Sequence, residues 1–241
     1  MKPVKTFIIV LITFMSAASV KAQTADEIIA KHIAAIGGKE KLAQINSVYM
    51  ESTTEAMGNE SPSKTYIVNG KNCRIESDFG GQLIVQVVNE KSGWAIMPFG
   101  GSTDPVVMND DEFKNSADQI YVGGSLANYS ASGGKAELAG QEKVNNVNAY
   151  KIKYTNKFGV ETTYYLDPST YYVIESVRQA NMMGQTVTVT TTYSDYQKTD
   201  FGVMFPYAAN IDMGQFSLTT NTKKVEFNKE IDPKIFELPK K

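Results

Sequence analysis

The sequence holds few residues of the types that build metal centres, disulfides and nucleic-acid-binding surfaces. Among its 241 residues there are one cysteine, Cys73, and one histidine, His32. A lone cysteine excludes an internal disulfide framework and a thiolate zinc cluster, and a lone histidine excludes most zinc enzymes. The only arginines are Arg74 and Arg178, and the net charge is −2, so the chain lacks the basic surface that binds nucleic acid.

Long apolar runs are also scarce, and the only one lies near the start of the chain. Lys2 and Lys5 precede an uncharged segment whose centre, 7–15, is mostly apolar, and small residues lead to Ala22. This order is typical of a cleaved export signal, and the apolar part is shorter than the about 20 residues that cross a bilayer as a helix. We therefore predict a signal peptide over 1–22 and a single domain over 23–241.

Cleavage after Ala22 leaves 241 − 22 = 219 residues, and the loss of three lysines gives a net charge of −2 − 3 = −5. Gln23 stands where a bacterial lipoprotein would need a lipid-anchored cysteine. We therefore expect a soluble chain in the periplasm or outside the cell, with no integral membrane segment after cleavage.

The mature sequence opens with one helical pattern and then changes to the two-residue period of strands. Thr24 and Glu27 form the pattern of a capping box, an isoleucine stripe follows at helical spacing, and glycines at 37 and 38 end it. Alternating segments predict strands near 47–57, 64–69, 72–79, 82–89 and 93–97, and again near 135–138, 150–155, 160–166, 172–179, 186–196, 203–212 and 216–227.

Between the two sets of strands lies a glycine-rich insertion, residues 98–132. A weak apolar face predicts a helix over 110–121, with Asp110 or Asp111 as its cap, and a short turn of helix over 125–129. So many strands exceed what a flat sheet tolerates. We predict a mainly β, α+β fold: a curled antiparallel half-barrel covered on its concave side by the N-terminal helix and a helical lid insertion.

The chemistry-bearing residues favour no catalytic or metal site. His32 falls within the isoleucine stripe of the first helix, and Cys73 falls in a strand, so buried packing is the preferred interpretation of both. The acidic run Asp110-Asp111-Glu112 lacks the spacing of a calcium loop and suits a helix N-terminus. We predict no cofactor and no metal, although paired carboxylates of the glycosidase type stay open.

Apolar and aromatic residues gather in and before the insertion. They have two interpretations: ordinary core under a loop, or a movable apolar cover over a ligand cavity. The second makes nine residues candidates for lining the cavity or its lid: Trp94, Ile96, Met97, Phe99, Phe113, Ile120, Tyr121, Leu126 and Met204.

Several segments of the sequence resemble the LolA-like superfamily, which includes the outer-membrane lipoprotein carrier, and above all its secreted relatives of the Bacteroidetes type. They are the opening helix over 25–42, the runs 137–144, 150–152 and 164–170, the segment from Tyr196 to Pro206, and the closing Asp232-Pro233-Lys234-Ile235-Phe236. The resemblance implies an incomplete barrel around a hydrophobic cavity for acyl chains, without catalysis. The carrier also holds its lid shut through an arginine, for which Arg74 and Arg178 are the only candidates and neither lies in a matching motif.

Three functions remain from the sequence. The first is a non-enzymatic periplasmic carrier, a chaperone in lipoprotein sorting to the outer membrane, whose partner is a lipid or a lipoprotein acyl chain. The second is an envelope sensor or interaction module of the same fold, with an outer-membrane or other envelope protein as its partner. The third, which the sequence favours least, is an acid-based hydrolase.

Overall fold

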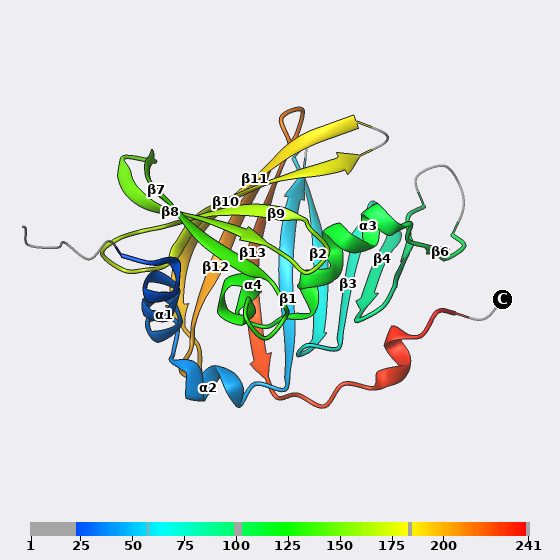
Figure 1. Cartoon of the computed structure of the whole chain (residues 1–241). Coiled ribbons are helices and arrows are strands. Elements are labelled where there is room, and N and C mark those ends of the chain that lie inside the picture. The colour runs from blue at the N-terminus through cyan, green and yellow to red at the C-terminus, as the bar shows by residue number, and fades with distance from the viewer. Residues whose placement is uncertain (1–22, 57, 99–102, 183–184, 240–241) are drawn as a thin grey trace, which may run out of the picture.

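The computed structural model describes residues 23–56, 58–98, 103–182 and 185–239. The predicted signal peptide, residues 1–22, and Phe99 lie outside these residues. Within them, thirteen strands form one sheet in the order β6-β5-β4-β3-β2-β1-β13-β12-β11-β10-β9-β8-β7 (Figure 1). Because β6 and β7 stand at opposite ends of this order, the sheet does not close into a barrel.

Every strand pairs antiparallel with its neighbours. The strands are β1 Ser47–Ala56, β2 Asn59–Val68, β3 Asn72–Phe79, β4 Gln82–Asn89, β5 Gly93–Ile96, β6 Val106–Val107, β7 Lys135–Val144, β8 Val147–Thr155, β9 Glu161–Leu166, β10 Val173–Met182, β11 Gln185–Lys198, β12 Met204–Asp212 and β13 Ser217–Phe227. β13 pairs with β1, so the last strand joins the two halves of the sheet.

The helices are short and few. They are α1 Ala25–Ala35, α2 Lys39–Ala43, α3 Asp110–Ser116, α4 Gly124–Asn128, and the 3-10 helices η1 Ala117–Ile120 and η2 Pro233–Phe236. α1, α3 and α4 lie on one side of the curled sheet, which we call the concave face (Figure 1). The predicted fold class, a mainly antiparallel sheet with few helices that curls without closing, is confirmed.

The helix starts follow from local hydrogen bonding. In α1, the Thr24 hydroxyl accepts from the Glu27 amide at 3.2 Å, and the Glu27 carboxylate accepts from the Thr24 amide at 3.1 Å, so the predicted capping box is confirmed. The cap of α3 is Asn109, not Asp110 or Asp111 as predicted. Both acids instead lie in the first turn, where the helix dipole favours negative charge.

The two faces of the sheet can be read from the register. Side chains of residues directly opposite each other in an antiparallel pair point to the same face. α1 and α4 pack on Ile152, Tyr154 and Leu166, which fixes the concave face of β8 and β9. Successive partners then carry this face across the sheet, from Tyr154 to Thr162, Arg178 and Val189.

The segment after β13 lies on the other face, which we call the convex face. Trp94 of β5 and Val85 and Val87 of β4 pack there with Phe236 of η2. The Trp94 indole donates a hydrogen bond to the Phe236 carbonyl at 3.1 Å. Among the described residues, no helix is both long and apolar enough to cross a bilayer.

Candidate functional site

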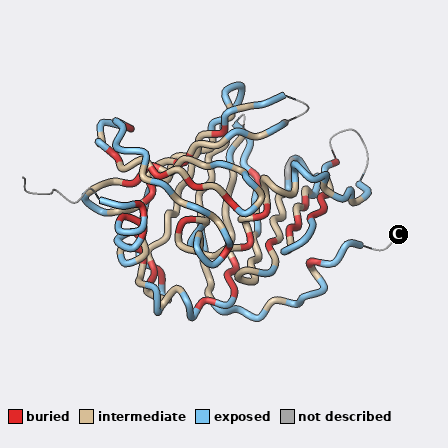
Figure 2. Tube along the Cα trace, in the orientation of Figure 1, coloured by how far each residue is buried: buried red, intermediate tan, exposed pale blue. Residues whose placement is uncertain are grey.

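The insertion is fastened to the concave face by a few hydrogen bonds at its centre. The Gly70 amide donates to the Ile120 carbonyl at 2.8 Å, and the Val122 amide donates to the Asn69 side-chain oxygen at 3.0 Å. The Gln86 side chain of β4 donates to that of Gln119 at 2.8 Å. α3 contains no buried residue, so the buried side chains of these helices come from η1 and α4 (Figure 2). α3 is attached through Phe113 and through its Lys114 carbonyl, which accepts from the Asn156 side chain at 3.2 Å.

Three apolar clusters lie on the concave face under or beside the insertion, and two of them lie on opposite halves of the sheet; the third, around Ile45, Val48 and Val203, contacts Val122 of the insertion. On β3 and β4, Cys73 and Val88 pack against Ile120, with Phe113 and Tyr121 at the margin. On β8 and β9, the second cluster joins the sheet to α1 and α4, and it contains Ile28, Ile29, Leu126, Ile152, Tyr154 and Leu166. The two ends of the insertion therefore contact separate parts of the concave face.

The strands between these clusters carry hydroxyl groups on the concave face. Thr54 and Thr220 hydrogen-bond through their hydroxyls at 3.1 Å, and Ser52 donates to Thr222 at 3.4 Å. All four are half-buried. Neighbouring residues with the same orientation continue this hydroxyl band: Ser63, Thr65, Thr162, Ser176, Thr191 and Tyr193. The middle of the concave face therefore carries this hydroxyl band and, toward the other end of β1, the apolar side chains of Val48, Met50 and Val225.

The nine residues predicted to line a cavity or its lid do not come together in one place. Phe113, Ile120 and Tyr121 share one concave cluster, while Leu126 belongs to the other. Trp94 and Ile96 point to the convex face, and Met97 is exposed. Met204 opens β12 opposite Lys198 and is half-buried, and Phe99 lies outside the described residues. Only the insertion residues are thus placed to contact a ligand on the concave face.

Two of the better-formed hollows of the described structure lie away from the insertion's contacts with the sheet. One, of about 380 Å³, opens on the convex side between β5 and the C-terminal segment, and Trp94, Phe236 and Leu238 line it. The other, of about 400 Å³, follows the residues that join α1 to α2, from Gly37 to Gln44. Where Ile120 packs against Cys73 and Val88, an acyl chain would have to displace it.

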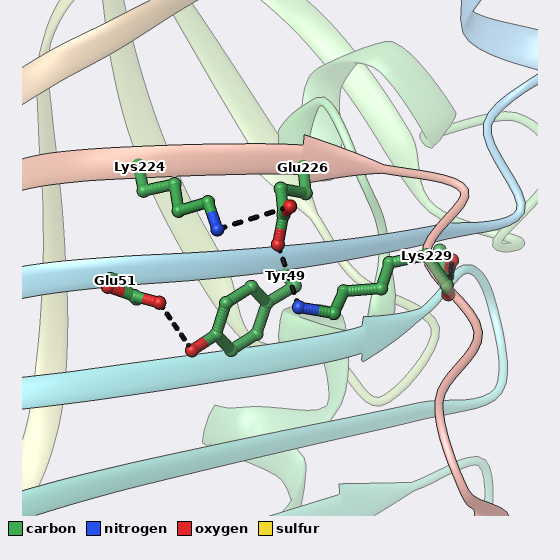
Figure 3. Close-up of polar contacts among 6 residues, drawn as sticks. Tyr49, Glu51, Lys224, Glu226 and Lys229 are labelled. Atoms are coloured by element: carbon green, nitrogen blue, oxygen red, sulfur yellow. Dashed lines mark hydrogen bonds and ion pairs between the residues drawn. The ribbon is translucent and has the colours of Figure 1, made fainter.

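The convex face near β1 and β13 carries a network of paired charges (Figure 3). The Tyr49 hydroxyl donates to Glu51 at 2.8 Å, and the Lys229 ammonium lies 4.0 Å from the centre of the Tyr49 ring. The Glu226 carboxylate forms ion pairs with the ammonium groups of Lys224, at 3.2 Å, and Lys229, at 2.8 Å. These contacts fix the turn by which the chain leaves β13 toward η2.

The two arginines lie on opposite faces and have different surroundings. Arg74, on the convex face, pairs with Glu76 at 2.7 Å, donates to the Ile235 carbonyl at 2.7 Å and lies over the Trp94 ring. Arg178, on the concave face of β10, forms no ion pair and no hydrogen bond with the described residues. Arg74 therefore secures the C-terminal segment, and its contacts do not reach the insertion.

One acidic group of the insertion is partly buried against the sheet. The carboxyl of Asp118 in η1 faces the side chains of Tyr154, Asn156 and Ser125, and burial raises its pKa although these hydrogen-bonding groups oppose the shift. The Tyr154 hydroxyl is itself buried, without a well-formed hydrogen bond in the described structure. The contact between η1 and β8 is therefore polar and incompletely satisfied, unlike the apolar clusters on either side.

His32 and Cys73 are both packing residues. His32 is buried, its Nδ1 lies 2.8 Å from the Tyr171 carbonyl oxygen, and burial lowers its pKa. Burial raises the pKa of the Cys73 thiol to about 12, so a nucleophilic thiolate is disfavoured there. Among the described residues, no group of three or more histidine, cysteine, aspartate or glutamate side chains is arranged to hold a metal ion.

Comparison with known proteins identifies the architecture. No family model matches the sequence, and no curated protein matches it. A solved structure of a LolA superfamily protein from Nitrosomonas europaea is similar, with a TM-score of 0.60 and 14% identity, over 90% of this chain and 98% of that one. The chain has a LolA-like fold.

Two further structures share the LolA-like fold over 88% of this chain and 97% of their own. A DUF1329 family protein from Desulfovibrio piger has a TM-score of 0.58 and 13% identity. A domain named an outer membrane lipoprotein-sorting protein, from Vibrio parahaemolyticus, has a TM-score of 0.55 and 12% identity. At such identities the likeness establishes the LolA-like fold, and function has to be argued from the residues of this chain.

Sequence reasoning missed the hydroxyl band. All of its serines and threonines except Ser63 fall in predicted strands, where such residues are ordinary. Their common orientation depends on the register of β1, β2, β9, β10, β11 and β13, which brings distant segments into one sheet. The available signal was the regular threonine spacing of β11, at 186, 188, 190 and 192, but Thr191 and Tyr193, with the opposite parity, face the insertion side.

Proposed function

We propose that this chain is an exported, non-enzymatic binding protein that carries the acyl chain of a lipoprotein or another lipid on its concave face. The export-type segment over residues 1–22 supports a periplasmic location after cleavage. The LolA-like fold supports a carrier role, because one of the matched structures is named a lipoprotein-sorting domain. The fold alone does not specify the ligand, so the proposal depends on the insertion.

The observation that carries the proposal is the way the insertion is attached. Its apolar side chains Phe113, Ile120 and Tyr121 contact the sheet, α3 contributes no buried residue, and a small number of hydrogen bonds fasten it to the sheet. A segment held in this way has a low cost of local opening. When it lifts, an acyl chain takes over the apolar contacts, and each buried methylene contributes roughly 0.8 kcal/mol.

The test is uptake of a fluorescent fatty-acid analogue by the mature chain, 23–241. We expect saturable binding at micromolar probe, and we expect Phe113→Ala to weaken it several-fold because the ring contacts the concave cluster. The matched control is Phe216→Ala, which removes a phenyl ring that is 37% exposed beside the β12–β13 turn. Native mass spectrometry of protein purified from cells should show co-purified lipid.

Absence of both co-purified lipid and probe uptake would contradict the carrier proposal. That outcome would favour the second function, an interaction module for an envelope protein. One observation supports it: three of the exposed large apolar residues, Val106, Val107 and Leu238, lie at or beside the convex hollow. β6 is also an edge strand, and edge strands accept a further strand from a partner.

A further inference from the structure

The half-buried guanidinium of Arg178 is the least explained charged group of the described chain. A charge that is partly removed from water is costly unless a partner compensates it. Arg74 has a carboxylate, a carbonyl and an aromatic ring around it. Arg178 is also half-buried, but it has neither an ion pair nor a hydrogen bond among the described residues.

The nearby acids do not face Arg178. On its own strand, Glu175 lies at a position of opposite parity and therefore points to the convex face. On β9, Glu161 has the same convex orientation and pairs with Lys153 at 3.7 Å. α3 packs against β10, but its acids form no ion pair with Arg178. The concave face around Arg178 therefore carries a positive charge without a counter-ion.

The groups that do surround Arg178 are hydrogen-bonding hydroxyls and apolar side chains. Its direct strand partners are Thr162 on β9 and Val189 on β11. Its positive charge acts on Tyr193, whose hydroxyl lies 3.2 Å from that of Ser176. A guanidinium beside hydroxyl donors is the arrangement that recognises carboxylate and phosphate oxygens.

We propose that Arg178, with the hydroxyls of Thr162 and Tyr193, binds the anionic head group of the lipid whose chain lies on the concave face. This inference rests on the proposed carrier function and names its ligand class: an amphiphile with one oxyanion head group, a carboxylate or a phosphate. The head group would supply the counter-ion that Arg178 lacks. The chain would extend from the hydroxyl band toward the apolar contacts of the insertion.

The experiment compares four probes by competition against the fluorescent fatty-acid analogue: hexadecanoate, hexadecyl phosphate, hexadecanol and inorganic phosphate. For the wild type, we expect the two anionic amphiphiles to bind at least tenfold more tightly than the alcohol, as a charge-assisted hydrogen bond provides. Arg178→Gln should abolish this preference without weakening the alcohol, and Arg178→Lys should retain part of it. Thermal unfolding checks that each variant is folded.

The matched control is Lys153→Gln, which removes a cation from the convex face of β8 and should keep the preference. Equal binding of acid and alcohol by the wild type, or an unchanged preference in Arg178→Gln, would overturn the inference while the carrier proposal stands. Binding of inorganic phosphate as tightly as hexadecyl phosphate would also overturn it, because the site would then recognise a free anion. Failure of all chain-bearing probes would overturn both proposals.

Discussion

The two faces of the sheet differ in whether their charged side chains have partners. On the convex face, Arg74 is enclosed by Glu76, the Ile235 carbonyl and the Trp94 ring, and the lysines near Tyr49 are paired with Glu226. On the concave face, Arg178 forms no ion pair or hydrogen bond with any described residue, and Asp118 lies against an incompletely bonded Tyr154 hydroxyl. A network whose polar groups are all paired stabilises the fold. Where polar groups are left unpaired, a ligand or a conformational change can supply the missing partners.

The C-terminal segment explains this difference. After β13 it crosses the convex face and supplies Phe236 and the Ile235 carbonyl to residues of β3, β4 and β5. The insertion covers the concave face instead, and the buried residues of its helices lie in η1 and α4, with none in α3. The first cover is therefore part of the folded core, and the second is the one that the carrier proposal requires to open.

The largest expected effect comes from removing the centre of the convex cluster. Trp94→Ala should lower the free energy of unfolding by about 3–5 kcal/mol, because a buried indole and its hydrogen bond to Phe236 are lost. Urea unfolding measures this, and the exposed neighbour Met97→Ala should change it by less than about 0.5 kcal/mol. A folded Trp94→Ala protein should bind the fatty-acid probe normally. Weaker binding would place the ligand on the convex face and remove the contrast between the two covers.

A smaller loss of stability is expected when Arg74, whose charge is paired on the convex face, is replaced. Arg74→Gln should cost about 1.5–3 kcal/mol of stability, because the charged hydrogen bond to Ile235 is lost and Glu76 is left unpaired. It should also expose the C-terminal segment to limited proteolysis. The matched control is Lys151→Gln, which breaks the more exposed pair with Glu142. In this variant the C-terminal segment should be cleaved at the wild-type rate. Proteolysis of Arg74→Gln at the wild-type rate would contradict the role given to Arg74.

The fold was accessible from the sequence because its signals are local. Period-two alternation and turn residues predicted twelve of the strands, most of them near their observed bounds, and Thr24 with Glu27 marked the first helix. Two strands were predicted too short: 64–69 for β2, Asn59–Val68, and 135–138 for β7, Lys135–Val144. β6 was missed because two residues, Val106 and Val107, carry no period and are defined only by pairing with β5. The cap of α3 was misassigned because asparagine and aspartate serve equally well, so Asn109, Asp110 and Asp111 all fit the pattern.

The site was less accessible because it depends on contacts between distant segments. Trp94 and Ile96 precede the insertion in sequence and were grouped with it. Alternation indicates that they share a face, but only the return of η2, some 140 residues later, shows which face that is. Likewise, the sequence shows two arginines, and only the pairing of three strands shows that one of them has no counter-ion.

The smallest expected effect is on the pH dependence of stability, and it comes from the partly buried carboxyl of Asp118 on the concave face. Because burial raises the pKa of Asp118, the folded chain binds this proton more tightly than the unfolded chain does. This group's contribution to stability should therefore fall as the pH rises through the shifted pKa. Asp118→Asn should remove that part of the pH dependence and make the variant relatively more stable at pH 7 than at pH 4.

Other carboxyls titrate over the same range, so the measured quantity is the difference between wild type and variant in urea unfolding at each pH. Asp111→Asn, an exposed acid of the same insertion, is the matched control and should give a difference that barely changes with pH. If Asp118→Asn behaved in the same way, the carboxyl would be as well solvated as those on the convex face. Asp118 would then no longer distinguish the concave face from the convex face. Of the two charged groups, Arg178 alone would support a ligand on the concave face.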